Sequence, residues 1–443
     1  MAAKQPNIIL IVIDTLRADH LGCYGYHRDT SPQLDRLAQD GALFLEAYCA
    51  GIPTQPAHTS IFTGVHPLVH QIVCHKSLAE VQLSPQIRML PQELVRNGYV
   101  TAAVDNLATK YLQTSWFLRG YDFYLSAGGE KVISRGVKSH AEKVNHLALE
   151  WIKSFGAQAN DTGRPFFLFL HYWDPHAPYA PPPPYDRKFY PDDPQRGEQE
   201  GIEKLRTTAY GKYLMENWRS YVGVGPMNPT FADALYDGEV AYASFMVDRF
   251  LQTARKLGVL EDAVVVVTGD HGEDLWEGTH GRCFDHGDLC HCVVHIPLIL
   301  VAPGRVPPGV KTTQMVQHTD IFPTLLELIG APVPEELSGM SLLPVVAGKR
   351  GGHDEILIVT NGWLTKRKLR TSQWSLSQTL RPDRHGNTAG HLDLYRLDAD
   401  PLEQNNLADT ECAVADKLLA RMETLTRSML ADRPDPLLTQ TPS

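Results

Sequence analysis

The run Asn7-Ile-Ile-Leu-Ile-Val-Ile-Asp14 decides the fold class of this chain. Its central residues, 8–13, are all apolar and mostly β-branched, with no alternation of apolar and polar side chains. A continuous run of this kind is typical of a strand that is buried on both faces, as in a parallel sheet covered by helices. The run ends at an acid, Asp14. We therefore expect a buried parallel strand that brings a carboxylate to the edge of a sheet.

Similar apolar runs recur along the chain and alternate with helical patterns. Strands are predicted at 99–105, 165–171, 263–270 and 296–301, and helices at 32–41, 89–98, 141–154 and 231–257. This alternation predicts an α/β fold with a large, mainly parallel sheet sandwiched between helices. Beyond residue 348 the pattern changes to short strands and a helix near 414–430. We therefore assign residues 1–348 to a catalytic α/β domain and 349–443 to a small C-terminal α+β subdomain.

The composition is that of an ordinary globular protein, with 43% apolar and 21% charged residues. A net charge of −10 argues against a nucleic-acid partner, because phosphate binding requires clustered cations. The N-terminal apolar run is too short to span a bilayer and lacks the cleavage pattern of a secretion signal. Seven cysteines without framework spacing favour reduced thiols. We expect a cytoplasmic protein without membrane contacts, and the oligomeric state stays open, a homo-oligomer included.

Polar side chains follow several of the predicted strands. In open α/β sheets, ligands bind outside the carboxyl ends of the strands. The residues at this edge are Asp14, His171, Asp174, His176, Asp270 and His271. Gly272 permits a turn after Asp270-His271, so both side chains can reach one ion, and a mixture of oxygen and nitrogen ligands suits a divalent cation. The alternative is an exposed turn with a capping aspartate.

The stretch Gly51-Ile-Pro-Thr-Gln-Pro-Ala-His-Thr-Ser-Ile-Phe-Thr-Gly64 places one hydroxyl, Thr54, between two prolines. Proline restricts its own φ angle and the conformation of the preceding residue, which suits a fixed nucleophile. The alternative is a stiff loop that leads into a helix. Thr54, Asp14, Asp270 and His271 together form a consistent four-ligand set.

These four residues occur in the order and context found in the alkaline phosphatase superfamily, and the chain most resembles its sulfatase branch. The motifs that carry the resemblance lie at 7–25, 30–38, 173–179, 268–273, 318–330 and 393–407, and they span nearly the whole chain. The resemblance implies an alkaline phosphatase-like fold and a hydrolase that acts on esters of an inorganic acid.

The nucleophile position departs from the sulfatase pattern. Sulfatases place Cys or Ser in Cys-x-Pro-x-Arg and oxidise it to formylglycine, whereas this chain has Thr54, Pro56 and His58. A secondary alcohol cannot be oxidised to an aldehyde, so we expect no formylglycine. Cys49 lies five residues out of register and is not favoured as the nucleophile. A threonine resembles the nucleophile of nucleotide pyrophosphatase/phosphodiesterases, phosphoethanolamine transferases and phosphonoacetate hydrolases, which attack phosphorus.

The resemblance also implies roles for further histidines. His176 resembles the histidine that contacts sulfate in sulfatases, and His286 stands where they keep a lysine. Because an imidazole replaces that cation, we predict a second metal ion at His176 and His286, with Asp174 or His280 as a further ligand. Alternatively, these histidines only hydrogen-bond the substrate or solvent.

The residue after Asp14 bears on the identity of the metal. Thr15 replaces a calcium-binding aspartate of the family, which favours zinc or manganese over calcium. His58 could protonate a leaving group, orient Thr54, or only pack.

The sequence thus predicts a metal-dependent hydrolase of phosphate or phosphonate esters that forms a covalent phospho-Thr54 intermediate. The catalytic residues are Thr54, His58, His176 and His286, and the substrate is a small anionic ester. The alternatives are a sulfatase without formylglycine, a phosphoryl-group transferase, and a catalytically silent binding protein. A zinc cluster of Cys283, Cys290, His291 and Cys292 is not favoured, because Cys-x-Cys with one distant Cys lacks the usual pairing.

Overall fold

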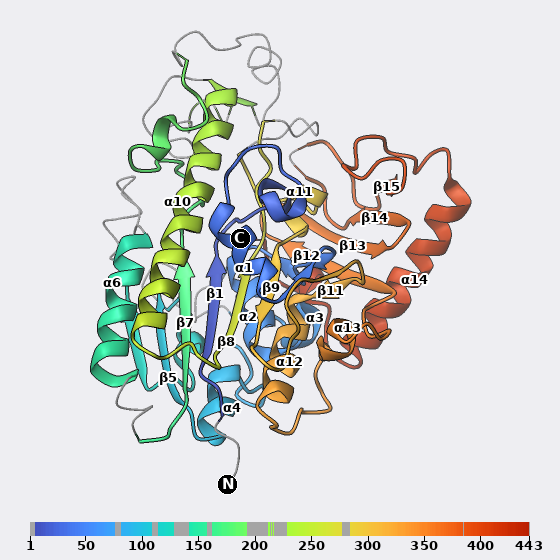
Figure 1. The fold of residues 1–443 in the computed structure, drawn as a ribbon. Helices are drawn as coiled ribbons and strands as arrows, with labels where there is room; N and C mark the ends of the chain where they lie inside the picture. Colours follow the sequence, from blue (N-terminus) through green and yellow to red (C-terminus); the bar gives the residue numbers. More distant parts are fainter. Residues whose placement is uncertain are drawn as a thin grey trace.

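The computed structural model describes residues 5–75, 81–108, 114–127, 141–156, 162–192, 211–212, 214, 216, 228–276, 284–383 and 385–442. Figure 1 shows a large central sheet with helices around it, and a second, smaller sheet that carries α14 on its outer side. Among the described residues, no helix has both the length and the apolar composition needed to cross a membrane.

The larger sheet has eight strands and confirms the predicted fold class. In spatial order the strands are β10 (Val310–Thr312), β2 (Ala42–Phe44), β9 (Leu298–Val301), β8 (Val264–Gly269), β1 (Ile8–Ile13), β7 (Phe166–Tyr172), β5 (Val100–Asp105) and β6 (Phe123–Ser126). Neighbouring strands are parallel except at β9, which is antiparallel to both β8 and β2. The sheet is therefore mixed but mainly parallel.

Strand β1 shows why its sequence is apolar without interruption. Ile8, Leu10 and Val12 pack into one hydrophobic core, and the alternate residues of β1 pack into another. The first core contains residues of α2 (Thr54–Thr63), α4 (Leu90–Arg96) and α12 (Ile321–Leu328). The second contains residues of α1 (Pro32–Gln39), α6 (Ala141–Trp151) and α10 (Pro229–Lys256). Both faces of the sheet are thus covered by helices, as a continuous apolar strand requires.

The smaller sheet contains a strand from the N-terminal part of the chain. Its order is β15 (Leu392–Arg396), β14 (Trp374–Thr379), β13 (Thr365–Thr371), β12 (Glu355–Asn361) and β4 (Gly51–Ile52). Helix α14 (Cys412–Leu430) packs against β13 and β14. β4 pairs in parallel with β12 and lies two residues before Thr54. The domain boundary near residue 348 stays a prediction, because this sheet joins segments from both sides of it.

The remaining elements are short. They are the strands β3 (Ala47–Tyr48) and β11 (Val316–Gln317), which pair with each other, and the helices α3 (Pro67–His70), α11 (His291–Val294), α13 (Leu343–Val346) and α15 (Pro436–Thr439). Single helical turns lie at η1 (Ala18–His20), η2 (Gly22–Tyr24), η3 (Ser115–Leu118), η5 (Tyr185–Arg187) and η7 (His318–Asp320), and α6 continues as a π-helix, η4 (Ile152–Gly156).

Candidate active site

Three predicted metal ligands meet at the carboxyl edge of the larger sheet. Asp14 follows β1, and Asp270 and His271 follow β8, the strand paired with β1. One ligand atom from each of the three residues lies within 4.8 Å of the others, and all three side chains are buried. Oδ1 of Asp14 is buried without a hydrogen-bond partner, Oδ2 of Asp14 faces His171 Nε2 at 3.3 Å, and Oδ2 of Asp270 lies 3.4 Å from His271 Nε2. Buried carboxylates with so few partners are costly, so this donor set fits a divalent cation that these atoms would bind.

Backbone groups hold the ligands in position. Asp270 Oδ1 accepts hydrogen bonds from the amides of Thr15 (3.0 Å) and His271 (2.8 Å). His271 Nδ1 donates to the carbonyl of Gly272 (2.9 Å), so its Nε2 lone pair is available to a metal. Thr15 has a φ of +54°, a strained value for a β-branched residue, and this conformation directs its amide to Asp270.

Gly272 cannot carry a side chain at this turn. A Cβ atom there would lie 2.0 Å from the carbonyl oxygen of Cys292. The turn after Asp270-His271 therefore requires glycine, as the sequence predicts.

Thr54 lies beside these ligands. It is the first residue of α2, is 3% exposed, and its Oγ1 lies 3.5 Å from His271 Nε2. The predicted stiff loop does lead into a helix, and it also brings the hydroxyl to the ligand group. The amides at the start of α2 provide a positive electrostatic potential that favours an anionic oxygen at Thr54.

His58 lies one turn further along α2 and is completely buried. Its Nδ1 lies 3.0 Å from the carbonyl oxygen of Thr54 and 3.8 Å from Asp270 Oδ2. Its ring packs against His171, Phe169 and Phe117. Burial, and then the nearby His171, lower the pKa of His58 to about 4, so it is neutral near pH 7. The contact that would orient Thr54 is present, and protonation of a leaving group stays a prediction.

A histidine buried between two carboxylates supports Asp14, and the sequence did not reveal this role. His171 Nε2 lies 3.3 Å from Asp14 Oδ2, and His171 Nδ1 lies 2.7 Å from Asp105 Oδ1. Burial alone would lower the pKa of His171, but hydrogen bonds to Asp105 and Asp14 raise it to about 10. Asp105 ends β5, so a search for acids at predicted strand ends would have found it.

His286 and His176 lie next to the ligand group. The His286 ring stacks on His271 at 4.6 Å and lies 5.3 Å from the His176 ring. Glu273 Oε1 lies 3.2 Å from His286 Nδ1. Burial would lower the pKa of His286, but the charge and hydrogen bond of Glu273 raise it to about 9. His286 is therefore in its positively charged form at neutral pH, next to His271.

The other residues suggested for a second ion lie elsewhere or outside the described part of the chain. Asp174 Oδ2 accepts a hydrogen bond from the amide of Ala141 (3.1 Å), at the start of α6. His280 lies outside the described residues, and so does Cys283 of the zinc cluster that was not favoured. Within the described ranges, two groups of three His, Cys, Asp or Glu side chains lie close enough to share an ion, and neither includes His176 or His286. The second ion stays a prediction.

The sulfatase family model matches residues 6–331, about three quarters of the chain, and the model of the C-terminal part of N-sulphoglucosamine sulphohydrolase matches residues 278–428. The chain belongs to the sulfatase family. Human iduronate 2-sulfatase is 25% identical to it over 392 residues, which cover 74% of this chain and 70% of that protein. The resemblance to the sulfatase branch of the alkaline phosphatase superfamily is confirmed, and the protein is a hydrolase of ester bonds.

Solved structures of sulfatase-like proteins share the whole fold. The phosphonate monoester hydrolase of Agrobacterium radiobacter has a TM-score of 0.76 and 21% identity, with 96% of each chain covered. BT4656, in complex with its substrate D-glucosamine-2-N,6-O-disulfate, has a TM-score of 0.73 and 19% identity, and 98% of this chain and 99% of that chain are covered. At these identities the comparison shows the fold alone.

Six cysteines of this sulfatase-family chain lie within the described ranges, and none of them forms a disulfide there. That they are reduced stays a prediction. Cys49 is fully buried, and burial followed by the charge of Asp270 raises the pKa of its thiol well above the usual value. It is therefore a protonated packing residue.

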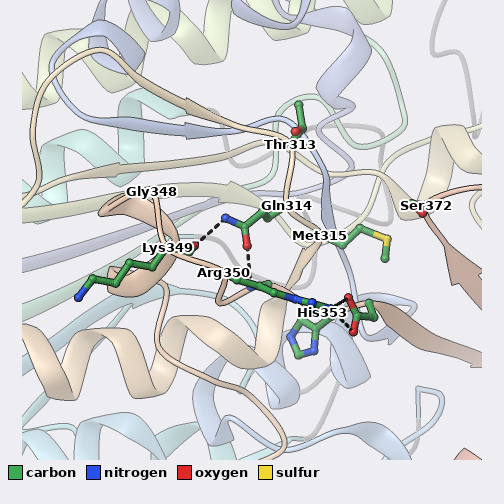
Figure 2. A pocket seen from close by; sticks show the side chains of 10 residues that line it. Thr313, Gln314, Met315, Gly348, Lys349, Arg350, His353 and Ser372 are labelled. Carbon is green, nitrogen blue, oxygen red and sulfur yellow. Dashed lines mark hydrogen bonds and ion pairs between the residues drawn. The ribbon is translucent and has the colours of Figure 1, made fainter.

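A separate pocket of about 390 Å³ is lined by residues 313–315, which connect β10 to β11, by residues of the segment 348–354, which connects α13 to β12, and by Ser372. Figure 2 shows Gln314 in its wall, bonded to the carbonyl oxygen of Lys349 at 2.9 Å, with Arg350 and His353 nearby. His353 pairs with the buried Asp320 at 2.9 Å. No residue of this wall belongs to the group around Asp14, so we do not assign the pocket to the substrate.

Proposed function

We propose that this sulfatase-family chain is a metal-dependent hydrolase of phosphate or phosphonate esters that acts through a covalent phospho-Thr54 intermediate. The observation that carries the proposal is the place of Thr54 Oγ1, buried and 3.5 Å from His271 Nε2, beside Asp14 and Asp270. A threonine at this position cannot become formylglycine. Direct attack by its own oxygen is the chemistry left to it.

Asp14, Asp270 and His271 would hold one divalent ion, with Thr54 Oγ1 beside it. When bound, such an ion supplies Lewis-acid activation: it can lower the pKa of a coordinated hydroxyl by roughly eight units, or about 11 kcal/mol. The small oxygen and nitrogen donor set, with Thr15 in place of a further carboxylate, favours zinc or manganese over calcium.

Thr54, His58 and His286 have separate roles in the proposed reaction. Thr54 Oγ1 forms a bond to phosphorus as the bond from phosphorus to the leaving ester oxygen breaks, and the released alcohol takes up the proton that Thr54 loses. Water then cleaves the bond between phosphorus and Thr54 and restores the hydroxyl. The first amides of α2 stabilise negative charge on the Thr54 oxygen. His58 fixes the backbone of Thr54 through the carbonyl contact at 3.0 Å. His286, hydrogen-bonded to Glu273, lies on the open side of His271 with a side chain that is 22% exposed. We propose that it binds the non-bridging oxygens of the substrate, and that the Glu273–His286 pair takes the place of the second ion.

Substrate comparison tests this proposal. We expect aryl phosphonate monoesters or aryl phosphate diesters to be hydrolysed faster than the matching aryl sulfate. Thr54→Ala should lose at least about a thousandfold in kcat/KM, and Thr54→Ser should keep a measurable part of the activity because it retains an oxygen nucleophile. Efficient aryl sulfate turnover with negligible phosphorus chemistry would refute the proposal.

Two further measurements test the intermediate and the metal. Intact mass after an acid quench should show one phosphoryl group on the wild-type chain and none on Thr54→Ala. Elemental analysis of the C290S/C292S variant, which lacks the two thiols near Asp274, should show one zinc or manganese per chain. Two ions per chain in that variant would support the competing site at His176 and His286.

Sulfatase activity without formylglycine is the second candidate, because the curated relatives, such as human iduronate 2-sulfatase, are named sulfatases. A phosphoryl-group transferase is the third candidate. An added alcohol that captures the phosphoryl group in preference to water would favour it.

A further inference from the structure

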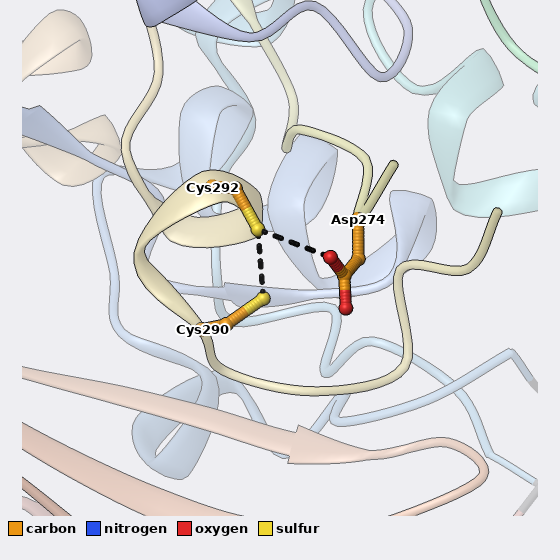
Figure 3. Close-up of side chains that lie close together, drawn as sticks. All are labelled: Asp274, Cys290 and Cys292. Atoms are coloured by element: carbon orange, nitrogen blue, oxygen red, sulfur yellow. Dashed lines mark hydrogen bonds between the residues drawn. The ribbon is translucent and has the colours of Figure 1, made fainter. Parts of the chain in front are cut away.

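The geometry points to a second, thiolate-containing metal site at Asp274, Cys290 and Cys292, which would take a soft divalent cation such as Zn²⁺. Figure 3 shows the two sulfur atoms and the carboxylate facing one another. Cys290 Sγ lies 3.0 Å from Cys292 Sγ, and Cys292 Sγ lies 3.7 Å from Asp274 Oδ1. Two sulfurs and a carboxylate oxygen within 4.8 Å of one another form a donor set that zinc accepts.

The distances agree with tetrahedral coordination after a small adjustment. With zinc–sulfur bonds of about 2.3 Å, two thiolates of one tetrahedron lie ~3.8 Å apart, and a thiolate and a carboxylate oxygen lie ~3.6 Å apart. The Asp274–Cys292 distance of 3.7 Å already fits. The sulfur–sulfur distance of 3.0 Å must increase by ~0.8 Å, which a change in one χ1 angle provides.

The site is different from the zinc cluster that the sequence suggested and rejected. Asp274 replaces the distant cysteine of that pattern, because the turn after β8 folds back onto the start of α11. Within the described ranges His291 does not join the group, and its ring stacks on His295 instead. Three protein ligands leave one tetrahedral position for water or another ligand.

The backbone at this site is held firmly on both sides. The amide of Asp274 donates to the carbonyl of Asp285 at 2.7 Å, and the amide of Gly272 donates to the carbonyl of Val293 at 2.7 Å. On the cysteine side, Lys368 donates to the carbonyl of Leu289 at 2.6 Å. The donor atoms are therefore positioned before a metal binds, which lowers the cost of ordering them.

Binding requires that the thiols lose their protons. The thiolate, and not the thiol, is the metal ligand. Binding of one Zn²⁺ forms two sulfur–metal bonds and one oxygen–metal bond and releases two protons to solvent.

A metal here would also stabilise the first site. Asp274 lies four residues after Asp270, on the same turn, and Cys290 and Cys292 lie at the start of α11. A cation would cross-link these two segments and hold the turn that presents Asp270 and His271. This inference concerns a structural site, and it does not depend on which ester the enzyme cleaves.

Cobalt spectroscopy separates the two sites, because the group around Asp14 contains no sulfur. Reduced, metal-free full-length protein is titrated with Co²⁺, and thiolate-to-cobalt charge-transfer absorption is recorded. We expect this absorption to saturate at one Co²⁺ per chain, with two protons released per ion bound at this site. His271→Ala should keep it, and Cys412→Ser, which removes an exposed thiol on α14, should not change it.

Two variants test the ligands independently. C290S/C292S should lose the charge-transfer absorption while its circular dichroism spectrum stays that of the wild type. D274N keeps both thiols and should bind Co²⁺ at least about tenfold more weakly. The proposal is wrong if the reduced wild type shows no thiolate–cobalt absorption, if the absorption persists in C290S/C292S, or if D274N binds with unchanged affinity.

Discussion

At the scale of single residues, the support of Asp14 by a charged histidine is a testable feature of the site. Asp105 accepts a hydrogen bond from His171 at 2.7 Å and another from the amide of Leu107 at 2.8 Å. Its hydrogen bond and negative charge raise the pKa of His171 against the effect of burial, and they direct that ring at Asp14. Residues that orient metal ligands in this way affect metal affinity by about 10- to 100-fold.

We therefore predict that Asp105→Asn weakens metal binding at Asp14, Asp270 and His271 by about 10- to 100-fold. Competition against a metal buffer of known affinity measures the change. Tyr124→Phe is the matched control, because the Tyr124 hydroxyl donates to the same carboxylate without contributing charge. If both variants weaken binding equally, the charge of Asp105 is not the cause.

At the scale of secondary-structure elements, His66 connects α3 to the smaller sheet. Its Nδ1 accepts a hydrogen bond from the amide of Leu68 at 3.2 Å, and its Nε2 donates to the carbonyl of Leu357, in β12, at 3.0 Å. Burial lowers the pKa of this histidine to about 4. The unfolded chain binds the proton near pH 6.5, so stability is full above that pH and falls as the pH drops toward 4.

We predict that His66→Asn makes folding less sensitive to acid. Asparagine caps the amide of Leu68 and carries no charge at any pH. Between pH 7 and pH 5, the wild type should lose about 2 kcal/mol more stability than the variant. Protonation of His66 in the unfolded chain begins near pH 6.5, and the interval of about 1.5 pH units down to pH 5 corresponds to that free energy. Denaturant midpoints at the two pH values measure it, and exposed His27→Asn is the control. Parallel losses in wild type and His66→Asn would contradict the prediction.

The elements also show what could be predicted from sequence. Strands β1, β5, β7 and β8 are long apolar runs, so each could be predicted from the pattern of its own residues. Strands β2 and β10 have three residues each and no periodicity, and they exist because neighbouring strands pair with them. The antiparallel direction of β9 is likewise a property of the whole sheet.

The same limit applies to the active site. Asp14, Asp270 and His271 follow strands that the sequence predicts, so their proximity at one edge of the sheet could be predicted as well. The roles of Asp105 and Glu273 depend on sheet order and on the segment that carries His286. The strand-end position of Asp105 is a local signal for the residue, but no local pattern specifies the histidine that either acid contacts.

At the scale of the whole molecule, the C-terminal segment completes the structure around Thr54. β12 pairs with β4, which leads directly into α2. Lys366 of β13 forms an ion pair with Asp288 at 3.0 Å, close to His286. Leu68, Val73 and Cys74 are fully buried in a core whose other members come from residues beyond 348.

We predict that a chain ending at residue 348 neither folds stably nor hydrolyses any ester substrate. Loss of residues 349–443 would expose the edge of β4 and an apolar surface around Leu68. It would also remove Lys366, the ion-pair partner of Asp288. Soluble yield, circular dichroism and activity of the truncated chain measure this, with a chain lacking only residues 441–443 as the control. In calorimetry the full-length protein should unfold in one transition, because the smaller sheet includes β4. Two independent transitions, or an active truncated chain, would show instead that residues 349–443 form a separable subdomain.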